Sequence, residues 1–162
     1  MITLYKWQEE CLGKWKENSH RGVIEVTTGG GKTILASSGA KRLYDEKEGK
    51  LSIYVVVPCI PLLTQWRDTL RLAGLEGVVI RNREKLITSD ISIFTINRAR
   101  DRVPLLIDSD MKNGSPFFLS STNSTTTEAE RTTISSTSVI PRTLKRSFTP
   151  PWASVPRQKC RR

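Results

Sequence analysis

The residues with the clearest chemical potential lie in a twelve-residue stretch, Gly22 to Thr33, with the sequence GVIEVTTGGGKT. Its three consecutive glycines allow backbone N–H groups to converge on phosphate oxygens, and a helix that begins at Lys32 adds its positive dipole end. A lysine in this position can reach the outer phosphates of a nucleotide, and the hydroxyl of Thr33 can hold Mg²⁺. The stretch therefore predicts a phosphate-binding loop.

One feature departs from the general pattern of such loops. The pattern has a further glycine five residues before Gly31, where this chain has Val26. The alternative interpretation is a flexible glycine turn that a lysine follows by chance. The flanking residues favour the phosphate site, because an apolar run, Val23 to Val26, predicts a strand before the loop and a helical pattern starts at Ile34 after it.

The elements that must position this loop alternate along the chain. Apolar residues at helical spacing, and short β-branched runs, predict the following elements: helices at 2–17, 32–44, 61–73 and 96–102, and strands at 51–57, 77–80, 91–95 and 103–107. Such alternation predicts an α/β domain with a mainly parallel sheet. The loop then lies at the carboxyl end of the first strand, where open α/β sheets bind ligands.

Composition limits the class of protein. The 162 residues suit about one domain, and no stretch has the ~18–20 apolar residues of a membrane span. The polar N-terminus does not resemble a secretory signal, and three widely spaced cysteines favour a reducing cytoplasm. The single histidine, His20, lies in a polar loop without a second catalytic group beside it, and we expect it to be exposed.

The net charge of +10 is unevenly distributed. Residues 1–110 carry 17 Lys and Arg against 14 Asp and Glu, whereas residues 111–162 carry 9 against 2. The second part is thus a basic tail, which can bind nucleic acid or simply be solvated.

Three further stretches narrow the class of phosphate-loop protein. They are Leu4 to Glu10 (LYKWQEE), Val55 to Pro58 followed by Leu62 to Trp66, and Asp90 to Ala99 (DISIFTINRA). In this order and spacing they resemble the N-terminal motor lobe of superfamily 2 helicases, in the group that includes the helicase subunits of type III restriction enzymes. The resemblance covers residues 3–108. It implies a P-loop, RecA-like three-layer domain that binds ATP and Mg²⁺ and acts on nucleic acid, with DNA favoured over RNA.

The resemblance assigns roles to individual residues. Gln8 matches a glutamine that contacts the adenine edge; its alternative is an exposed helix glutamine. Pro58 and Thr95 match segments that contact the nucleic-acid backbone, and both could equally be ordinary residues at strand ends. The residues that match the phosphate motif lie around the glycines: Thr28, Gly29, Gly30, Gly31, Lys32 and Thr33.

The family also requires an apolar strand that ends in Asp-Glu, where the Asp holds Mg²⁺ and the Glu orients the attacking water. The strand predicted at 103–107 is followed by Asp108, which would hold the metal together with Thr33. Ser109 then stands where the glutamate is expected, and Asp110 could replace the glutamate only if the backbone were displaced. We therefore expect little or no hydrolysis by this chain alone.

Beyond residue 110 the composition changes. Residues 111–162 contain 18 Ser and Thr and five Pro, and their apolar residues have no regular period, which is typical of disorder. The sequence thus predicts a partial ATP-binding lobe at 1–110 and a disordered tail at 111–162. The second lobe of the family, with its arginine finger, would have to come from elsewhere, for example a partner subunit. The abrupt change suggests the hypothesis of a truncated or frameshifted gene.

The sequence predicts an ATP-binding fragment of a helicase or translocase motor with weak contact to the nucleic-acid backbone. Two alternatives stay open. One is a phosphate-loop kinase for a small molecule, and the other is a non-enzymatic nucleic-acid binder that acts through the basic tail.

Overall fold

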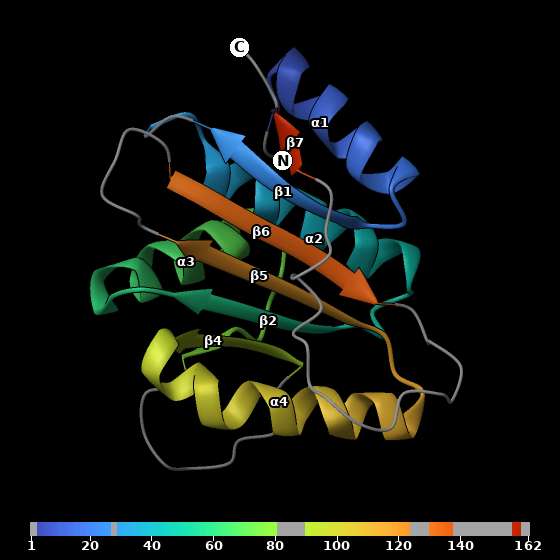
Figure 1. The fold of residues 1–162 in the computed structure, drawn as a ribbon, viewed down its shortest axis with the longest axis vertical. Helices are drawn as coiled ribbons and strands as arrows, with labels where there is room; N and C mark the ends of the chain where they lie inside the picture. The colour runs from blue at the N-terminus through green and yellow to red at the C-terminus, as the bar shows by residue number, and fades with distance from the viewer. Residues whose placement is uncertain (1–2, 27–28, 81–89, 124–129, 138–156, 160–162) are drawn as a thin grey trace.

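The computed structural model describes residues 3–26, 29–80, 90–123, 130–137 and 157–159, and the structural statements that follow concern these residues. They form one sheet with helices packed against it (Figure 1).

The sheet has seven strands in the order β3-β4-β2-β5-β6-β1-β7. The strands are β1 (Arg21–Val26), β2 (Ser52–Val57), β3 (Val79–Ile80), β4 (Ile91–Thr95), β5 (Phe117–Asn123), β6 (Glu130–Thr137) and β7 (Arg157–Lys159). Strands β3, β4, β2 and β5 are parallel, whereas β6 is antiparallel to both β5 and β1. Strand β1 therefore has the same direction as β5 and β2, and their carboxyl ends meet at one edge of the sheet (Figure 1).

Four helices cover the sheet, namely α1 (Lys6–Glu17), α2 (Lys32–Glu46), α3 (Ile60–Leu72) and α4 (Ile96–Asn113). The alternation of side chains along β2 decides which face each helix covers. Ile53, Val55 and Val57 belong to a core shared with α1, α2 and α3, whereas Tyr54 and Val56 belong to a second core shared with α4. The α/β fold class expected from the sequence is confirmed, with four parallel strands, β3, β4, β2 and β5, side by side in the sheet.

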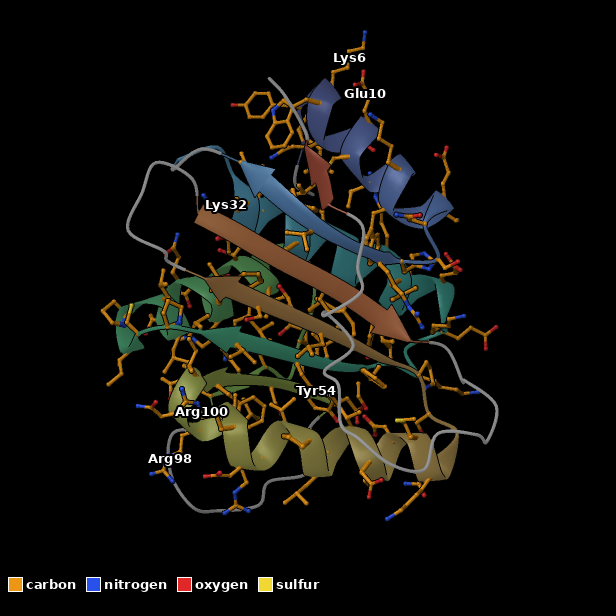
Figure 2. The ribbon with its side chains drawn as sticks, in the orientation of Figure 1. Lys6, Glu10, Lys32, Tyr54, Arg98 and Arg100 are labelled. Atoms are coloured by element: carbon orange, nitrogen blue, oxygen red, sulfur yellow. The ribbon has the colours of Figure 1, made fainter. Side chains whose placement is uncertain are left out.

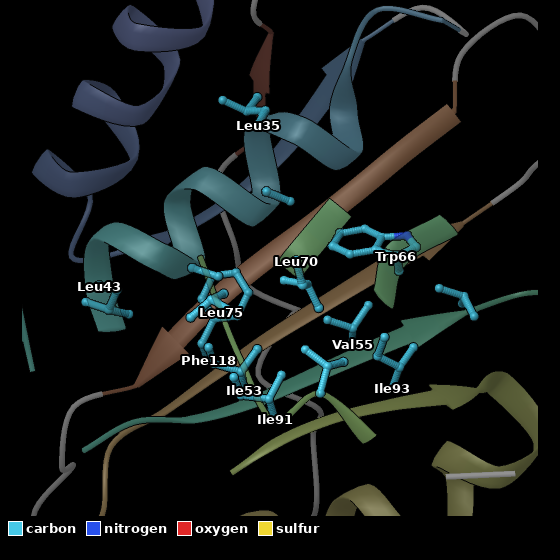
Figure 3. Close-up of a cluster of buried hydrophobic side chains, with 14 of the residues drawn as sticks. Leu35, Leu43, Ile53, Val55, Trp66, Leu70, Leu75, Ile91, Ile93 and Phe118 are labelled. Carbon is cyan, nitrogen blue, oxygen red and sulfur yellow. The ribbon is translucent and has the colours of Figure 1, made fainter. Parts of the chain in front are cut away.

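The larger core lies between α2, α3 and the sheet (Figure 3). Trp66 and Leu70 of α3 are at most 1% exposed and pack with Val55, Ile93 and Phe118 of the sheet. Each such side chain contributes about 1.5–3 kcal/mol through its removal from water. This core holds α2, and therefore the glycine loop before it, against the sheet.

The second core shows that one predicted element is wrong. Residues 103–107 are not a strand but part of α4, which continues to Asn113. Ala99, Val103, Leu106 and Ile107 follow helical spacing and pack on the far face of the sheet. Their burial outweighs the missing N–H of Pro104, which lies inside the helix.

The predicted domain boundary at residue 110 is also wrong, because it falls inside α4. The helix ends at Gly114, which adopts φ +67°, and β5 begins at Phe117. Phe117 and Phe118 are at most 4% exposed, so this segment lies in the sheet and not in a disordered tail. Their short apolar run is inconspicuous within a region rich in serine and threonine. Residues 124–129, 138–156 and 160–162 of the predicted tail lie outside the described residues.

One smaller expectation, the exposure of His20, is corrected. His20 is half-buried, its ring meets Trp15 edge-on with centroids 4.7 Å apart, and desolvation lowers the pKa of its imidazole. Cys59 is free and exposed, but Cys11 is disulfide-bonded. Among the described helices, none combines the length and apolar character needed to span a bilayer.

The contact between β2 and α4 generates a first prediction. The hydroxyl of Tyr54 donates a hydrogen bond to Oδ2 of Asp110 at 2.7 Å, in a partly buried position. Tyr54→Phe should lower the free energy of unfolding by about 1–2 kcal/mol, because the carboxyl group of Asp110 loses its partner. Urea denaturation measures this change.

The matched control is Asp108→Asn on the same helix. Asp108 pairs with Lys112 at 2.7 Å, but both side chains are more than 60% exposed. This variant should change the free energy of unfolding by less than about 0.5 kcal/mol. Equal effects of the two substitutions would contradict the role of Tyr54 in fixing α4.

Candidate functional site

The glycine loop connects the carboxyl end of β1 to α2. Gly29 and Gly31 adopt φ values of +77° and +80°, a backbone region that glycine enters without strain. Gly31 is the N-cap of α2, and no side chain caps this end of the helix. The N–H groups of Thr33 and Ile34 in the first turn therefore point toward any anion bound there. Thr28, predicted to belong to this motif, lies outside the described residues, and Gly30 is buried within the loop.

Lys32 is held inside the loop rather than in solvent. Its side chain is buried, and its Nζ donates a hydrogen bond to the carbonyl oxygen of Val26 at 3.1 Å. This hydrogen bond joins the end of β1 to the start of α2. It also compensates part of the free-energy cost of burying the ammonium group. Figure 2 shows Lys32 at the edge where the strands end.

Gln8 comes from α1 to the same loop. The side chain is 1% exposed, so the alternative of an exposed helix glutamine is wrong. Its Oε1 accepts a hydrogen bond from the N–H of Tyr5 at 2.9 Å, and its Nε2 donates to the carbonyl oxygen of Gly31 at 3.4 Å. Gln8 thus ties the start of α1 to the last glycine of the loop.

A cavity of about 420 Å³ opens beside the loop. Gly29, Gly31, Lys32 and Thr33 line one side of it, and Gln65 and Thr69 of α3 line another. Thr122, near the carboxyl end of β5, also lines the cavity. The sequence pattern did not reveal Thr122, because this segment was predicted to belong to a tail. The Gly114 turn, followed by three apolar residues from Phe117, was the signal that could have revealed the strand.

The structure does not support Asp108 as the metal-side carboxylate. Asp108 lies on the exposed side of α4, which packs on the other face of the sheet, and it pairs with Lys112. Ser109 is exposed on the same helix, and Asp110 accepts the hydrogen bond from Tyr54. The reason is the helical course of 103–107, which replaces the expected strand.

The side chains at the cavity fit the phosphate groups of ATP better than they fit Mg²⁺. Phosphate groups fit, because Lys32, Thr33 and the first turn of α2 supply donors. Protein-bound Mg²⁺ is normally held by one or two carboxylates in addition to phosphates. None of the described residues that line the cavity is acidic, and no metal-binding group of three or more His, Cys, Asp or Glu occurs in the described part of the chain. Thr33 lines the cavity and its hydroxyl could serve as a ligand of Mg²⁺, but the described lining residues offer no carboxylate beside it.

A second group of predicted residues meets at the same edge of the sheet. Val57 and Thr95 are register partners in the parallel pair β2–β4. Pro58, the next residue after Val57, is therefore close to Thr95. Thr95 is the N-cap of α4, and Arg98, Arg100 and Arg102 are exposed on the first turns of this helix. In Figure 2, Arg98 and Arg100 lie at the end of α4 that is on the same side of the molecule as Lys32.

Comparison with known proteins places the chain among motor proteins. The family described as "Type III restriction enzyme, res subunit" matches residues 1–137, which include β5 and β6. The DNA 3'-5' translocase XPB2 of Sulfurisphaera tokodaii is 29% identical over 113 residues, which are 65% of this chain and 24% of that protein. The chain thus spans about a quarter of the length of this relative.

The two left-handed glycines generate a second prediction. A Cβ on Gly31 would lie 2.8 Å from Nε2 of Gln8, whereas a Cβ on Gly29 would meet nothing within 4 Å. Gly29→Ala should cost only the backbone strain of a positive φ, about 1–2 kcal/mol. Gly31→Ala should cost about 1 kcal/mol more, because it also displaces the hydrogen bond of Gln8.

A double-mutant cycle separates the two contributions. In a Gln8→Ala background the extra cost of Gly31→Ala should disappear, and both alanine substitutions should destabilise the protein to a similar degree. Thermal or urea denaturation of the variants measures the coupling free energy. A coupling near zero would show that Gln8 does not brace the loop.

Proposed function

Because this chain belongs to the type III restriction enzyme res subunit family, among the superfamily 2 helicase and translocase ATPases, we propose that it binds ATP at its glycine loop. The supporting observation is the cavity at the N-terminus of α2, where Lys32, Thr33 and the loop glycines converge. The family favours a motor lobe over a small-molecule kinase.

Each residue of the loop has a part in this binding. Lys32 neutralises phosphate charge, and the first N–H groups of α2 accommodate phosphate oxygens with the positive end of the helix dipole. Gln8 braces Gly31 through one of its two amide hydrogens. The role proposed for Gln8 is therefore to position the loop, because its side chain is 1% exposed and is not among the residues that line the cavity. Thr33 is the one residue among those described at the cavity that is proposed as a protein ligand for Mg²⁺, and no acidic residue accompanies it there.

The edge formed by Pro58, Thr95 and the start of α4 is proposed to contact a nucleic-acid backbone. Supporting this, exposed Arg98 and Arg100 add positive charge next to Thr95. Contacts of this kind position a strand without reading its sequence. DNA is the proposed partner, because the matched relative is named as a DNA translocase.

Hydrolysis by this chain alone is proposed to be weak or absent. The family needs a strand that ends in Asp-Glu near the phosphates, and the strand that reaches the cavity here, β5, ends in Ser-Ser-Thr-Asn at residues 120–123. The change from apolar to hydroxyl-rich residues thus falls at Ser120, inside a strand. This moves the hypothesis of a frameshift from residue 111 to about residue 120. The other two reading frames of the DNA at this point test it, and the absence of an Asp-Glu motif in both would refute it.

The ATP proposal is tested with Lys32→Ala. This variant should bind ATP about 10–100-fold more weakly, because it removes a charged hydrogen bond of about 1.5–3 kcal/mol. Isothermal titration calorimetry measures the affinity. Lys50→Ala, an exposed lysine between α2 and β2, is the matched control and should bind as the wild type does. Unchanged affinity in Lys32→Ala would contradict the proposed site, and rapid DNA-stimulated hydrolysis would contradict the proposed loss of catalysis.

The DNA proposal is tested with the double variant Arg98→Ala/Arg100→Ala. Its affinity for a DNA duplex should fall, and the slope of log affinity against log salt should decrease by about 1–2, as expected for the loss of one or two phosphate contacts. Lys47→Ala/Lys50→Ala removes the same charge from the opposite edge of the sheet and should have a smaller effect. Equal losses in both double variants would point to nonspecific charge rather than to this edge.

A further inference from the structure

Strand β5 brings two hydroxyl groups to the face of the sheet that packs under α2 and α3. Phe118, Ser120 and Thr122 point to the same side because side chains alternate along a strand. Phe118 belongs to the core under α2 and α3. Ser120 is fully buried and Thr122 is 8% exposed, and neither hydroxyl has a hydrogen-bond partner among the described residues.

The two hydroxyls differ in what they face. Thr122 lines the cavity beside the glycine loop together with Lys32 and Thr33, whereas Ser120 does not line it. An unpaired buried hydroxyl is unfavourable for the folded protein. A ligand in the cavity can supply the missing partner of Thr122, but not that of Ser120.

The charge at the cavity indicates what this ligand is. Among the described residues that line the cavity, Lys32 is the one that carries a charge, and none is acidic. A hydroxyl can donate to a phosphate oxygen, whereas a carboxylate would need a cation between itself and the phosphate. ATP without Mg²⁺ carries more negative charge than its Mg²⁺ complex and is therefore attracted more strongly by Lys32 and the helix dipole.

We infer that this cavity holds the triphosphate of ATP without requiring Mg²⁺, and that the hydroxyl of Thr122 completes the site by donating a hydrogen bond to a phosphate oxygen. The inference rests on the proposed binding of ATP and adds the metal dependence and the residue on β5. It departs from the carboxylate-assisted binding that the family implies.

The first experiment is a calorimetric titration of the full chain with ATP, once in excess Mg²⁺ and once in EDTA. The affinity in EDTA should equal or exceed the affinity in Mg²⁺. An affinity at least tenfold weaker in EDTA would overturn the inference while the proposed ATP binding stands. No binding under either condition would overturn the proposed function itself.

The second experiment replaces Thr122 by residues of similar size. Thr122→Val removes only the hydroxyl, and should weaken ATP binding about 3–10-fold while raising the melting temperature by about 2–4 °C. Thr122→Ser keeps a hydroxyl and should retain the affinity. Ser120→Ala is the matched control, because it removes an unpaired hydroxyl outside the cavity and should leave the affinity unchanged. Wild-type affinity in Thr122→Val, or a lower melting temperature, would overturn the role of Thr122.

A third variant reverses the chemistry of the site. Thr122→Asp places a carboxylate at the end of β5, which repels the phosphates in EDTA and attracts Mg²⁺. ATP binding by this variant should therefore depend on Mg²⁺, with at least a tenfold loss of affinity in EDTA. Equal affinity of this variant in Mg²⁺ and in EDTA would show that position 122 does not face the phosphates.

Discussion

The burial of β2 on both faces is the constraint on which the rest of the structure depends. Its residues from Ile53 to Val57 are all buried, so helices must cover both sides of the sheet. Parallel neighbours of such a strand need crossover connections over those faces. Their carboxyl ends then meet at one edge, and the glycine loop, Thr122, Pro58 and Thr95 are brought there by this geometry.

Sequence patterns correctly predicted those helices and strands in which the local conformational preference of the residues agrees with their packing in the fold. The β-branched run of β2 and the amphipathic stripe of α3 are unambiguous, and the glycine loop has its strand before it and its helix after it. The segment from Val103 to Ile107 is different. A short apolar run with Pro104 inside fits a strand locally, and only packing against Tyr54 and Phe94 makes it a helix.

That error led to two others. A strand at 103–107 makes Asp108 a candidate metal ligand and makes the chain beyond it a tail. The true strand, β5, has three apolar residues before its hydroxyl-rich end, too few to stand out. The burial of Gln8 and the position of Thr122 at the cavity depend on contacts between distant segments, which composition and periodicity do not encode. Lys32 and Thr122 are polar groups in buried positions, which stable packing alone does not favour. Such departures are typical of functional sites.

The amide of Gln8 joins the residue before α1 to the last glycine of the loop. One end of it holds the N–H of Tyr5, just before α1, and the other holds the carbonyl of the glycine that opens α2. Tyr5 and Gly31 are therefore linked through one side chain, so that an ordered position of either residue favours an ordered position of the other. By reciprocity, a ligand that orders the loop at Gly31 also favours the hydrogen bond between Gln8 and the N–H of Tyr5, although Gln8 and Gly31 are 23 residues apart in the sequence.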